Sequence, residues 1–421
     1  MGFLSPSYSY SIILFLSIFY SINAYTQKDS PVFQTMLEVR EPAFAIKFMD
    51  AVQMNDQSVL ITGRFDYGEH QQHKERYAYD RSKYPSYIQT SFFGHPVTIL
   101  HKVDAKGKTL WTKLIPFGLQ GTAIASDGFN SHVITGYTPT EREKKYKNDR
   151  TQAITVMKVD SIGEILWSKI LPSDYNSTSN DIVMDKKGDL FILGDHQFAS
   201  NSDWKLNPSA IRLIKLNSKG DILWERSYPY DSIPYGSYHP TQLCLRENGD
   251  LFILGTNSDI HGIHLLRLNS MGYPTRIKEY NWPSSEYSNE WNYGFSMVAL
   301  DSGFVFSSSA YHGKKKGQHL VKIDDDFNII WETVHICDPI EKSRLAVNHQ
   351  QEIFFATNSD DNELVLAKYS KEGDLIMENT YPESKLFRIA EILCDQDGKP
   401  MIIGQKHTRG ISDWISVFYK N

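Results

Sequence analysis

The chain has 421 residues, with 44 lysine and arginine side chains against 50 aspartate and glutamate side chains, and a formal net charge of -6. Neither sign is gathered into a long block, which argues against a polyanionic partner such as nucleic acid. The 24 tyrosines, 22 phenylalanines and 8 tryptophans supply large flat side chains that suit strand faces and sheet interfaces. Length alone would suggest more than one domain, but internal repeats override that expectation.

Residues 1–24 contain no charged side chain, and the apolar stretch 12–22 has the length of a signal-peptide core. We expect cleavage after Ala24, so that 25–421 form an exported protein that is secreted or held in the periplasm or cell envelope. The alternative is an uncleaved anchor, but the apolar run is shorter than the roughly 20 residues that a spanning helix needs. We therefore expect no stable membrane span after cleavage of this signal peptide.

Two kinds of hairpin alternate along the rest of the chain. In the first kind, an apolar strand runs into a polar turn and then into a second apolar run that ends in a small residue. The continuous apolar runs are typical of strands that are covered on both faces. These inner hairpins lie at 46–63, 122–136, 181–194, 242–255, 296–308, 345–357 and 389–404.

The second kind of hairpin carries Asp or Asn, two residues, Gly, three residues and Trp. The Asp or Asn side chain can close a turn on its own backbone, and Gly accepts the positive φ that a tight hairpin needs. Three weaker copies keep the spacing, with Arg276 or Met377 in the Trp place and Phe327 in the Gly place. The clear copies run from Asp104 to Trp111, from Asp160 to Trp167 and from Asn217 to Trp224.

One inner and one outer hairpin per repeat predict an all-β fold, a seven-bladed β-propeller of four-stranded antiparallel blades forming a single domain over 25–421. The Trp hairpins should lie outside and wedge between blades. The last inner hairpin is followed by only one strand, 414–419, and a segment near 33–39 can complete this blade. Pairing of the N- and C-terminal strands would then close the ring and remove an open edge. Six and eight blades are the alternative counts.

A long insertion, 65–96, separates the two hairpins of the first blade and is rich in Tyr, His, Lys and Arg. Loops of this length in compact domains are often functional. Smaller excursions, 138–152 and 196–210, fall at the corresponding place in the next two blades. We therefore expect all three segments to project from one face of the disk, which we call the loop-bearing face.

Candidate metal ligands are few. Glu69, His70 and His73 could share a metal ion, but three neighbours on one loop are not a preformed coordination sphere, and solvent-exposed loop side chains are the favoured interpretation. The carboxylate run 324–326 lies where a hairpin needs turn residues, which favours a turn over a calcium site.

The three cysteines, Cys244, Cys337 and Cys394, lie far apart and form no CxxC pair. We expect neither a disulfide framework nor a zinc cluster, and we interpret Cys244 and Cys394 as small buried hydrophobes on strands. The sequence contains no catalytic motif, so we name no catalytic residue and expect no metal and no cofactor.

The recurring Asp, Gly and Trp pattern resembles the repeats of PQQ-like (quinoprotein-type) propellers, over nearly the whole chain that follows the signal segment. Quinoprotein dehydrogenases of this kind have eight blades and adjacent cysteines against the cofactor, whereas this chain has neither adjacent cysteines nor room for an eighth blade. The resemblance therefore implies the fold and a noncatalytic exported member, similar in repeat type to envelope propellers that scaffold outer-membrane assembly. It implies no cofactor or calcium site.

Our leading hypothesis is a noncatalytic binding or scaffolding propeller, monomeric, that holds a protein or glycan partner on the loop-bearing face. Rigid blades with long loops on one face suit recognition. The alternative is a carbohydrate-active propeller enzyme, a glycoside hydrolase or lyase, in which carboxylates from several blades meet at the central channel. Such a site would leave no linear motif.

Overall fold

The structure is a computed structural model, and the regular secondary structure within its described residues is entirely β-strand. No helix in that part of the chain is long and apolar enough to cross a membrane. The described residues are 32–39, 44–67, 97–115, 120–141, 150–173, 175–197, 209–228, 238–257, 262–281, 293–312, 315–336, 343–359, 361, 363–381, 387–408 and 411–418.

Six blades each use four strands that are consecutive in the chain. Blades 1 to 3 comprise β2 (Phe44–Gln53), β3 (Val59–Tyr67), β4 (Val97–Val103) and β5 (Thr109–Ile115); β6 (Gln120–Ser126), β7 (Ser131–Glu141), β8 (Arg150–Asp160) and β9 (Ile165–Leu171); and β10 (Asn176–Met184), β11 (Leu190–Gln197), β12 (Ser209–Leu216) and β13 (Ile222–Tyr228). Blades 4 to 6 comprise β14 (Tyr238–Leu245), β15 (Leu251–Asn257), β16 (Gly262–Leu268) and β17 (Pro274–Tyr280); β18 (Gly294–Ala299), β19 (Phe304–His312), β20 (Lys315–Ile323) and β21 (Ile329–Ile336); and β22 (Arg344–Val347), β23 (Ile353–Asn358), β24 (Leu364–Tyr369) and β25 (Leu375–Tyr381).

A further four-stranded sheet is composite. It has the order β1-β28-β27-β26 and joins the first strand of the chain, β1 (Val32–Val39), to β26 (Phe387–Cys394), β27 (Pro400–Thr408) and β28 (Ile411–Phe418). In it β1 pairs antiparallel with β28, from Val32 opposite Phe418 to Val39 opposite Ser412. The predicted count of seven blades is therefore reached only if this composite sheet is counted, because consecutive strands alone give six blades.

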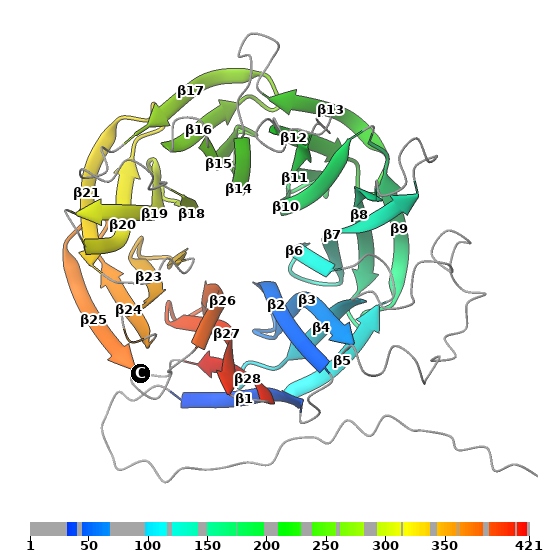
Figure 1. The fold of residues 1–421 in the computed structure, drawn as a ribbon, viewed down its shortest axis with the longest axis horizontal. Coiled ribbons are helices and arrows are strands. Elements are labelled where there is room, and N and C mark those ends of the chain that lie inside the picture. The colour runs from blue at the N-terminus through cyan, green and yellow to red at the C-terminus, as the bar shows by residue number, and fades with distance from the viewer. Residues whose placement is uncertain are drawn as a thin grey trace, which may run out of the picture.

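The sheets are arranged around one axis, with the first strand of each inner hairpin nearest to it (Figure 1). Each of these innermost strands contacts the innermost strands of the two neighbouring sheets, in the cyclic order β2, β6, β10, β14, β18, β22 and β26. The prediction of an all-β propeller with four-stranded antiparallel blades is thus confirmed. The prediction that the Trp hairpins lie outside is confirmed too, since they form the third and fourth strands of each blade.

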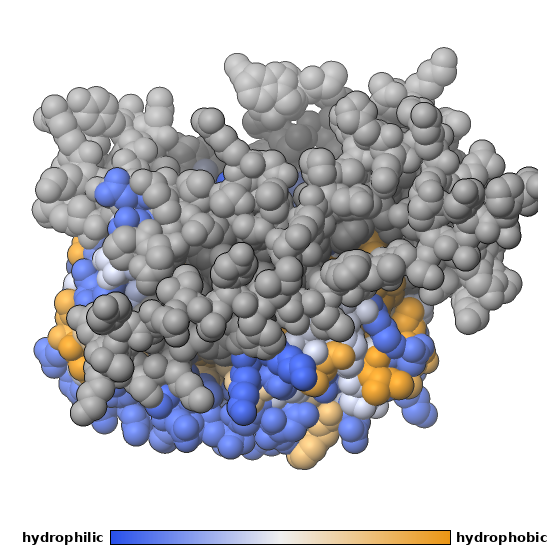
Figure 2. Space-filling model, turned by 90° about the horizontal axis from the view of Figure 1, so that it is seen from below, coloured by the Kyte–Doolittle hydropathy of each residue, from blue (hydrophilic) through white to orange (hydrophobic). Residues whose placement is uncertain are grey.

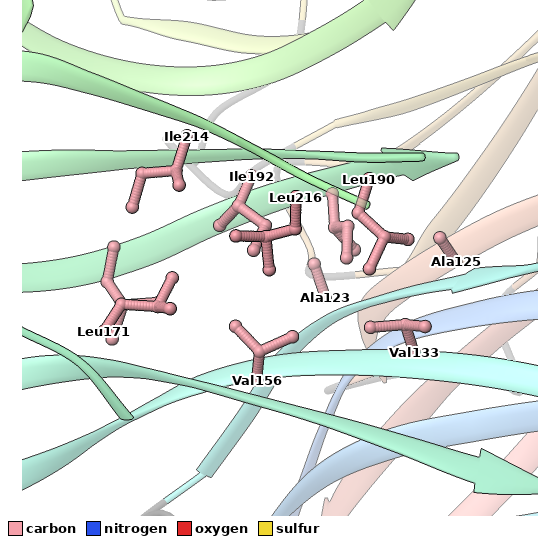
Figure 3. Close-up of a cluster of buried hydrophobic side chains, with 11 residues drawn as sticks. Ala123, Ala125, Val133, Val156, Leu171, Leu190, Ile192, Ile214 and Leu216 are labelled. Carbon is pink, nitrogen blue, oxygen red and sulfur yellow. The ribbon is translucent and has the colours of Figure 1, made fainter. Parts of the chain in front are cut away.

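Apolar side chains fill the spaces between neighbouring blades. Figure 3 shows one such cluster, in which Val133 and Val156 of blade 2 meet Ile192 and Ile214 of blade 3, and all four are buried. The second strand of blade 3 is buried from Leu190 to His196 because a blade lies on either side of it. Two other clusters pack β26 and β27 of the composite sheet against blade 6 and against blade 1.

Each repeat Trp packs on the glycine of the outer hairpin in the following blade. A Cβ added at Gly163 would meet the Trp111 ring at 2.9 Å, and one added at Gly220 would meet the Trp167 ring at 3.0 Å. These glycines also have positive φ, 78° and 80°. The position therefore needs glycine for two reasons, the left-handed backbone of the turn and the ring of the preceding blade.

One junction departs from this pattern on both sides at once. Phe327 occupies the glycine place of blade 5 at a φ of 62°, and it is 2% exposed. The preceding blade carries Arg276 in the Trp place, and its guanidinium pairs with Asp326 at 3.1 Å. At this junction the aromatic side chain comes from the hairpin of blade 5 instead of from the outer strand of blade 4, so one aromatic ring still fills the space between the two blades.

Several sequence predictions fall partly or wholly outside the described residues. The signal segment 1–24, the metal candidates Glu69, His70 and His73, and Cys337 are among them. Of the insertion 65–96, the structure describes only the end of β3. Cys244 and Cys394 lie on strands, β14 and β26, as predicted, and their free thiols pack against the cores of two blade interfaces, but the side chains are partly rather than fully buried.

Candidate functional site

A bulge interrupts the pairing of the first two strands in every sheet except blade 6, and the residue that follows the bulge occupies an equivalent position in each; Arg344 is its equivalent in blade 6. In blade 1 the register shifts between Phe48 and Asp50, and in blade 3 between Ser179 and Asp181. Bulges re-aim the side chains next to them. The residues at this position, which we call the axial ring, are Asp50, Ala123, Asp181, Gln242, Ser296, Arg344 and Glu391.

Side chains of the axial ring bind the backbone of the next sheet. The amide of Ile124 in blade 2 donates to Asp50 Oδ2 at 2.8 Å, and the amide of Leu243 in blade 4 donates to Asp181 Oδ2 at 2.7 Å. Gln242 Oε1 accepts from the amide of Met297 in blade 5 at 2.6 Å. Each of these contacts links two innermost strands that belong to different sheets.

In the next two blades a hydroxyl and a guanidinium group hold the neighbouring backbone in place of a carboxylate or an amide. Ser296 Oγ accepts from the amide of Leu345 at 3.2 Å, and Arg344 Nε donates to the carbonyl of Ala390 at 2.7 Å. Arg344 also lies 3.5 Å from the carboxylate of Glu391, and both side chains are 19% exposed. The residue types differ from blade to blade, but five ring members hold the neighbouring backbone.

The three carboxyl groups of the axial ring, those of Asp50, Asp181 and Glu391, are buried, and burial disfavours their charged forms. Burial raises the pKa of Asp181 to about 7, and burial followed by the charges of Glu391 and Asp181 raises the pKa of Asp50 well above its ordinary value. Burial also raises the pKa of Glu391, against the opposing charge of Arg344. The charge of Glu391 thus acts on both Asp50 and Asp181, which belong to other sheets.

These carboxyl groups already have hydrogen-bond donors. Asp50 Oδ1 accepts from the amide of Ala51 and Asp181 Oδ1 accepts from the amide of Ile182, each at 2.7 Å. Both oxygens of Asp50 and of Asp181 therefore hold a backbone N–H group. The axial ring acts first as a set of connectors between blades.

A second polar group lies between the outer strands. In blade 3 Arg212 is fully buried and binds Glu225 with two nitrogens, at 2.9 and 3.1 Å, and the carbonyl of Pro172 at 2.7 Å. Burial favours the protonated form of Glu225, but hydrogen bonds from His196 and Arg212 lower its pKa to about 2. Blade 3 is thereby tied to the strand connection that precedes it.

The next blades repeat this arrangement with histidine in place of arginine. His264 lies 3.4 Å from Glu279 in blade 4, and His319 lies 3.2 Å from Glu332 in blade 5. Burial lowers the pKa of His319, so the imidazole is neutral at pH 7. No group of three or more His, Cys, Asp or Glu residues in the described ranges could hold a metal ion.

Sequence analysis expected carboxylates at the central channel only in the enzyme alternative, and it named none of the residues of the axial ring, although a local signal was present. Asp50, Asp181 and Glu391 each stand directly before the apolar residues of an innermost strand, at the start of Asp-Ala-Val, Asp-Ile-Val and Glu-Ile-Leu. The run 324–326 forms a turn, as predicted, in which Asp324 Oδ1 accepts from the amides of Asp326 and Asn328.

No family model matches the sequence, and no curated protein matches it. Among solved structures, the chain is similar to a Trypanosoma rangeli sialidase with TM-score 0.49 and 10% identity over 94% of this chain and 60% of that one. A glucose dehydrogenase has TM-score 0.43 and 12% identity over 93% and 99% of the chains. A Bacteroides caccae protein of unknown function has TM-score 0.43 and 10% identity over 70% and 94%.

At such identities and TM-scores these similarities transfer no activity. The chain spans 60% of the length of the sialidase chain. The sheet order and the cyclic contacts define the class: this is a β-propeller protein with four-stranded antiparallel blades.

Proposed function

We propose that this chain is a noncatalytic, exported binding or scaffolding propeller that holds a protein or glycan partner on the loop-bearing face. The observation that carries the proposal is the hydrogen bonding of the axial carboxylates. Asp50 and Asp181 use both carboxylate oxygens to hold backbone amides, one of which belongs to the next blade. A hydrolytic acid or base needs an oxygen that can reach the substrate.

The strand connections support a recognition role for one end of the disk. The second strands of blades 1, 2 and 3 end at Tyr67, Glu141 and Gln197. The connections that follow, 68–96, 142–149 and 198–208, depart from equivalent ends of equivalent strands. Connections of different length on a rigid repeated scaffold suit recognition of a partner.

The remaining features of the proposal rest on the sequence and on sheet pairing. The composite sheet would serve as a seventh blade that closes the ring by pairing the chain ends, and its contacts with blades 1 and 6 support this role. The apolar segment 12–22 would direct export, and the Trp repeat supports membership of the PQQ-like propellers. We propose that the protein acts as a monomer without a cofactor.

The test is a pull-down from cell-envelope extract with the full chain and with a variant in which 68–96 is replaced by a short Gly-Ser linker. We expect the full chain to capture a protein or glycan, and the variant to lose it while retaining the unfolding transition of the parent. A matched control replaces 142–149 in the same way. Unchanged capture by both variants would contradict a role for these connections.

A carbohydrate-active enzyme is the second candidate, and one observation favours it. Asp50, Asp181 and Glu391 come from different sheets, burial raises the pKa of all three, and the charge of Glu391 raises the pKa of both aspartates further. A general acid requires a raised pKa. A hydrolysis screen on a glycan array decides between the candidates. Turnover that is lost in a folded Asp181→Asn variant would replace the binding proposal with the enzymatic one.

A further inference from the structure

The outer strands of the propeller expose an aliphatic side chain just before the Trp place. Five blades share this feature, with exposures between 50% and 56%. The side chain next to it in the chain is the repeat Trp or Met, which turns inward to the neighbouring blade. Exposed apolar side chains that recur at one position can form an interaction surface, whereas scattered single ones need no explanation. The five residues are Leu110, Leu166, Leu223, Ile330 and Ile376.

The charge around these aliphatic residues is not uniform. In blades 5 and 6, the outer hairpin and strand segments 324–335 and 370–381 carry seven carboxylates and one lysine. The four corresponding segments of blades 1 to 4 carry six carboxylates and eight lysines or arginines. The four segments are 104–115, 160–171, 217–228 and 269–280. The outer segments of blades 5 and 6 therefore form an acidic arc, whereas those of blades 1 to 4 are nearly balanced.

The acidic arc is continuous across the two blades. β21 and β25 lie next to each other on the outer rim, at the left of Figure 1, and His335 of β21 contacts Glu378 of β25 at 3.3 Å. Burial lowers the pKa of His335, so the imidazole does not neutralise Glu378 at pH 7. In Figure 2 the lower end of the disk is mainly hydrophilic, and hydrophobic side chains appear on its left and right flanks.

Carboxylates differ in how far the protein itself neutralises them. Asp325 and Asp326 are paired with Arg246 and Arg276, on the side of blade 4. Beside β25 the described residues pair Glu372 only with Lys371, at 3.9 Å, and they form no ion pair with Asp374. Negative charge is therefore left over at the start of β25.

β25 also offers the geometry for an added strand. It is the outermost strand of blade 6, and among the described strands it pairs with β24 alone. Five of its seven residues are exposed, and Tyr381 alone is buried. Such an edge presents a row of backbone N–H and C=O groups to a partner strand. Leu375 and Ile376, 53% and 52% exposed, flank the edge.

We propose that the outer edge of β25, within the acidic arc, binds an extended segment of a partner protein in which aliphatic and basic side chains alternate. The segment adds to blade 6 as a fifth strand, so its backbone bonds to β25. Its aliphatic side chains cover Leu375 and Ile376, and its basic side chains meet Glu372 and Asp374. This site lies on the rim, and it is independent of the partner proposed for the loop-bearing face.

The test uses the full chain and fluorescent synthetic peptides of eight residues. We expect a peptide of alternating valine and lysine to bind, and one of alternating valine and glutamate to bind at least tenfold more weakly. Proline at the second and fourth positions of the lysine peptide should also abolish binding, because proline removes the backbone donors. Equal binding of the lysine and glutamate peptides, or binding of neither, would overturn the proposal.

Variants locate the site on the rim. Ile376→Lys should weaken binding of the lysine peptide at least tenfold, whereas Leu166→Lys at the same repeat position of blade 2 should leave it unchanged. Glu372→Gln with Asp374→Asn should weaken binding at least threefold without altering an apolar contact. Equal effects of Ile376→Lys and Leu166→Lys would refute the location.

Two further outcomes distinguish the rim site from the loop-bearing face and from self-association. Replacement of 68–96 should leave peptide binding intact, so that failure of the loop proposal and failure of the rim proposal are distinguishable. If Ile376→Lys instead changes the sedimentation of the chain without peptide, the edge is covered by a second copy of the chain, and the proposal is wrong.

Discussion

The contact between each Trp and the next blade can be measured with a pair of glycines in blade 3. Gly220 and Gly188 have almost the same φ, 80° and 82°. A Cβ at Gly220 would lie 3.0 Å from two atoms of the Trp167 ring, whereas a Cβ at Gly188 would meet nothing closer than 3.4 Å, the Cβ of Ser218. Alanine at either position suffers the same backbone strain, and only one of them meets a ring.

The expected magnitudes follow from these two effects. Left-handed backbone costs a non-glycine residue about 1–2 kcal/mol, so we expect Gly188→Ala to lower the free energy of unfolding by that amount. Overpacking typically adds about 1–3 kcal/mol, so Gly220→Ala should cost about 2–4 kcal/mol in total. The difference between the variants isolates the contribution of the Trp167 contact.

Urea-induced unfolding, followed by tryptophan fluorescence and circular dichroism, measures both free energies. The Trp167→Ala background serves as the control, because without the ring Gly220→Ala should cost no more than Gly188→Ala. Equal losses for the two glycine variants in the parent chain would refute the reasoning. An unchanged cost of Gly220→Ala in the Trp167→Ala background would refute it as well.

Three other predictions concern charge and packing. The folded pKa of Asp181, about 7, lies above its unfolded value, so ionisation of Asp181 opposes folding and its contribution to stability is lost as pH rises from about 4 to about 7. The free energy of unfolding of the parent relative to Asp181→Asn, measured by urea unfolding, should therefore fall between about pH 4 and about pH 7. A constant difference over that range would contradict this. Arg212→Met breaks a buried ion pair and should lower the free energy of unfolding by about 2 kcal/mol or more. In an NMR titration the pKa of Glu225 should move from about 2 toward its ordinary value. An unmoved pKa of Glu225 would contradict the pairing. Phe327→Gly should lower the free energy of unfolding by about 3 kcal/mol or more, measured by thermal or urea unfolding. Adding Arg276→Trp should recover part of that loss, because it restores the usual pair of Trp and Gly. A further loss in the double variant would show that the junction is filled differently.

Much of the fold was predictable from local sequence. The alternating hairpins, the Asp or Asn turn and the glycine with positive φ are short-range features, because each depends on residues that are neighbours in the chain. The substitutions at Arg276 and Phe327 were visible as departures from the repeat. The sequence did not show that these two substitutions lie at the same junction and compensate each other, because that depends on which neighbouring blade the Trp place faces.

The candidate sites depend on contacts between distant segments. The charge of Glu391 raises the pKa of Asp50 and of Asp181, beyond the effect of burial, only because the arrangement of the sheets around one axis brings their innermost strands near one another. Asp50 and Asp181 each accept from an amide of the next blade, that of Ile124 and that of Leu243 respectively.

The sequence by itself therefore determined the repeat unit, the positions of its turns and the strands that are covered on both faces. Those properties follow from side-chain periodicity and backbone conformational preference, which act over a few residues. Only the tertiary structure decided that the axial carboxylates tie blades together and that the acidic segments of blades 5 and 6 form one arc of the rim. Both depend on the order and direction in which blades pack, because that arrangement determines which charges and donors from distant parts of the chain become neighbours.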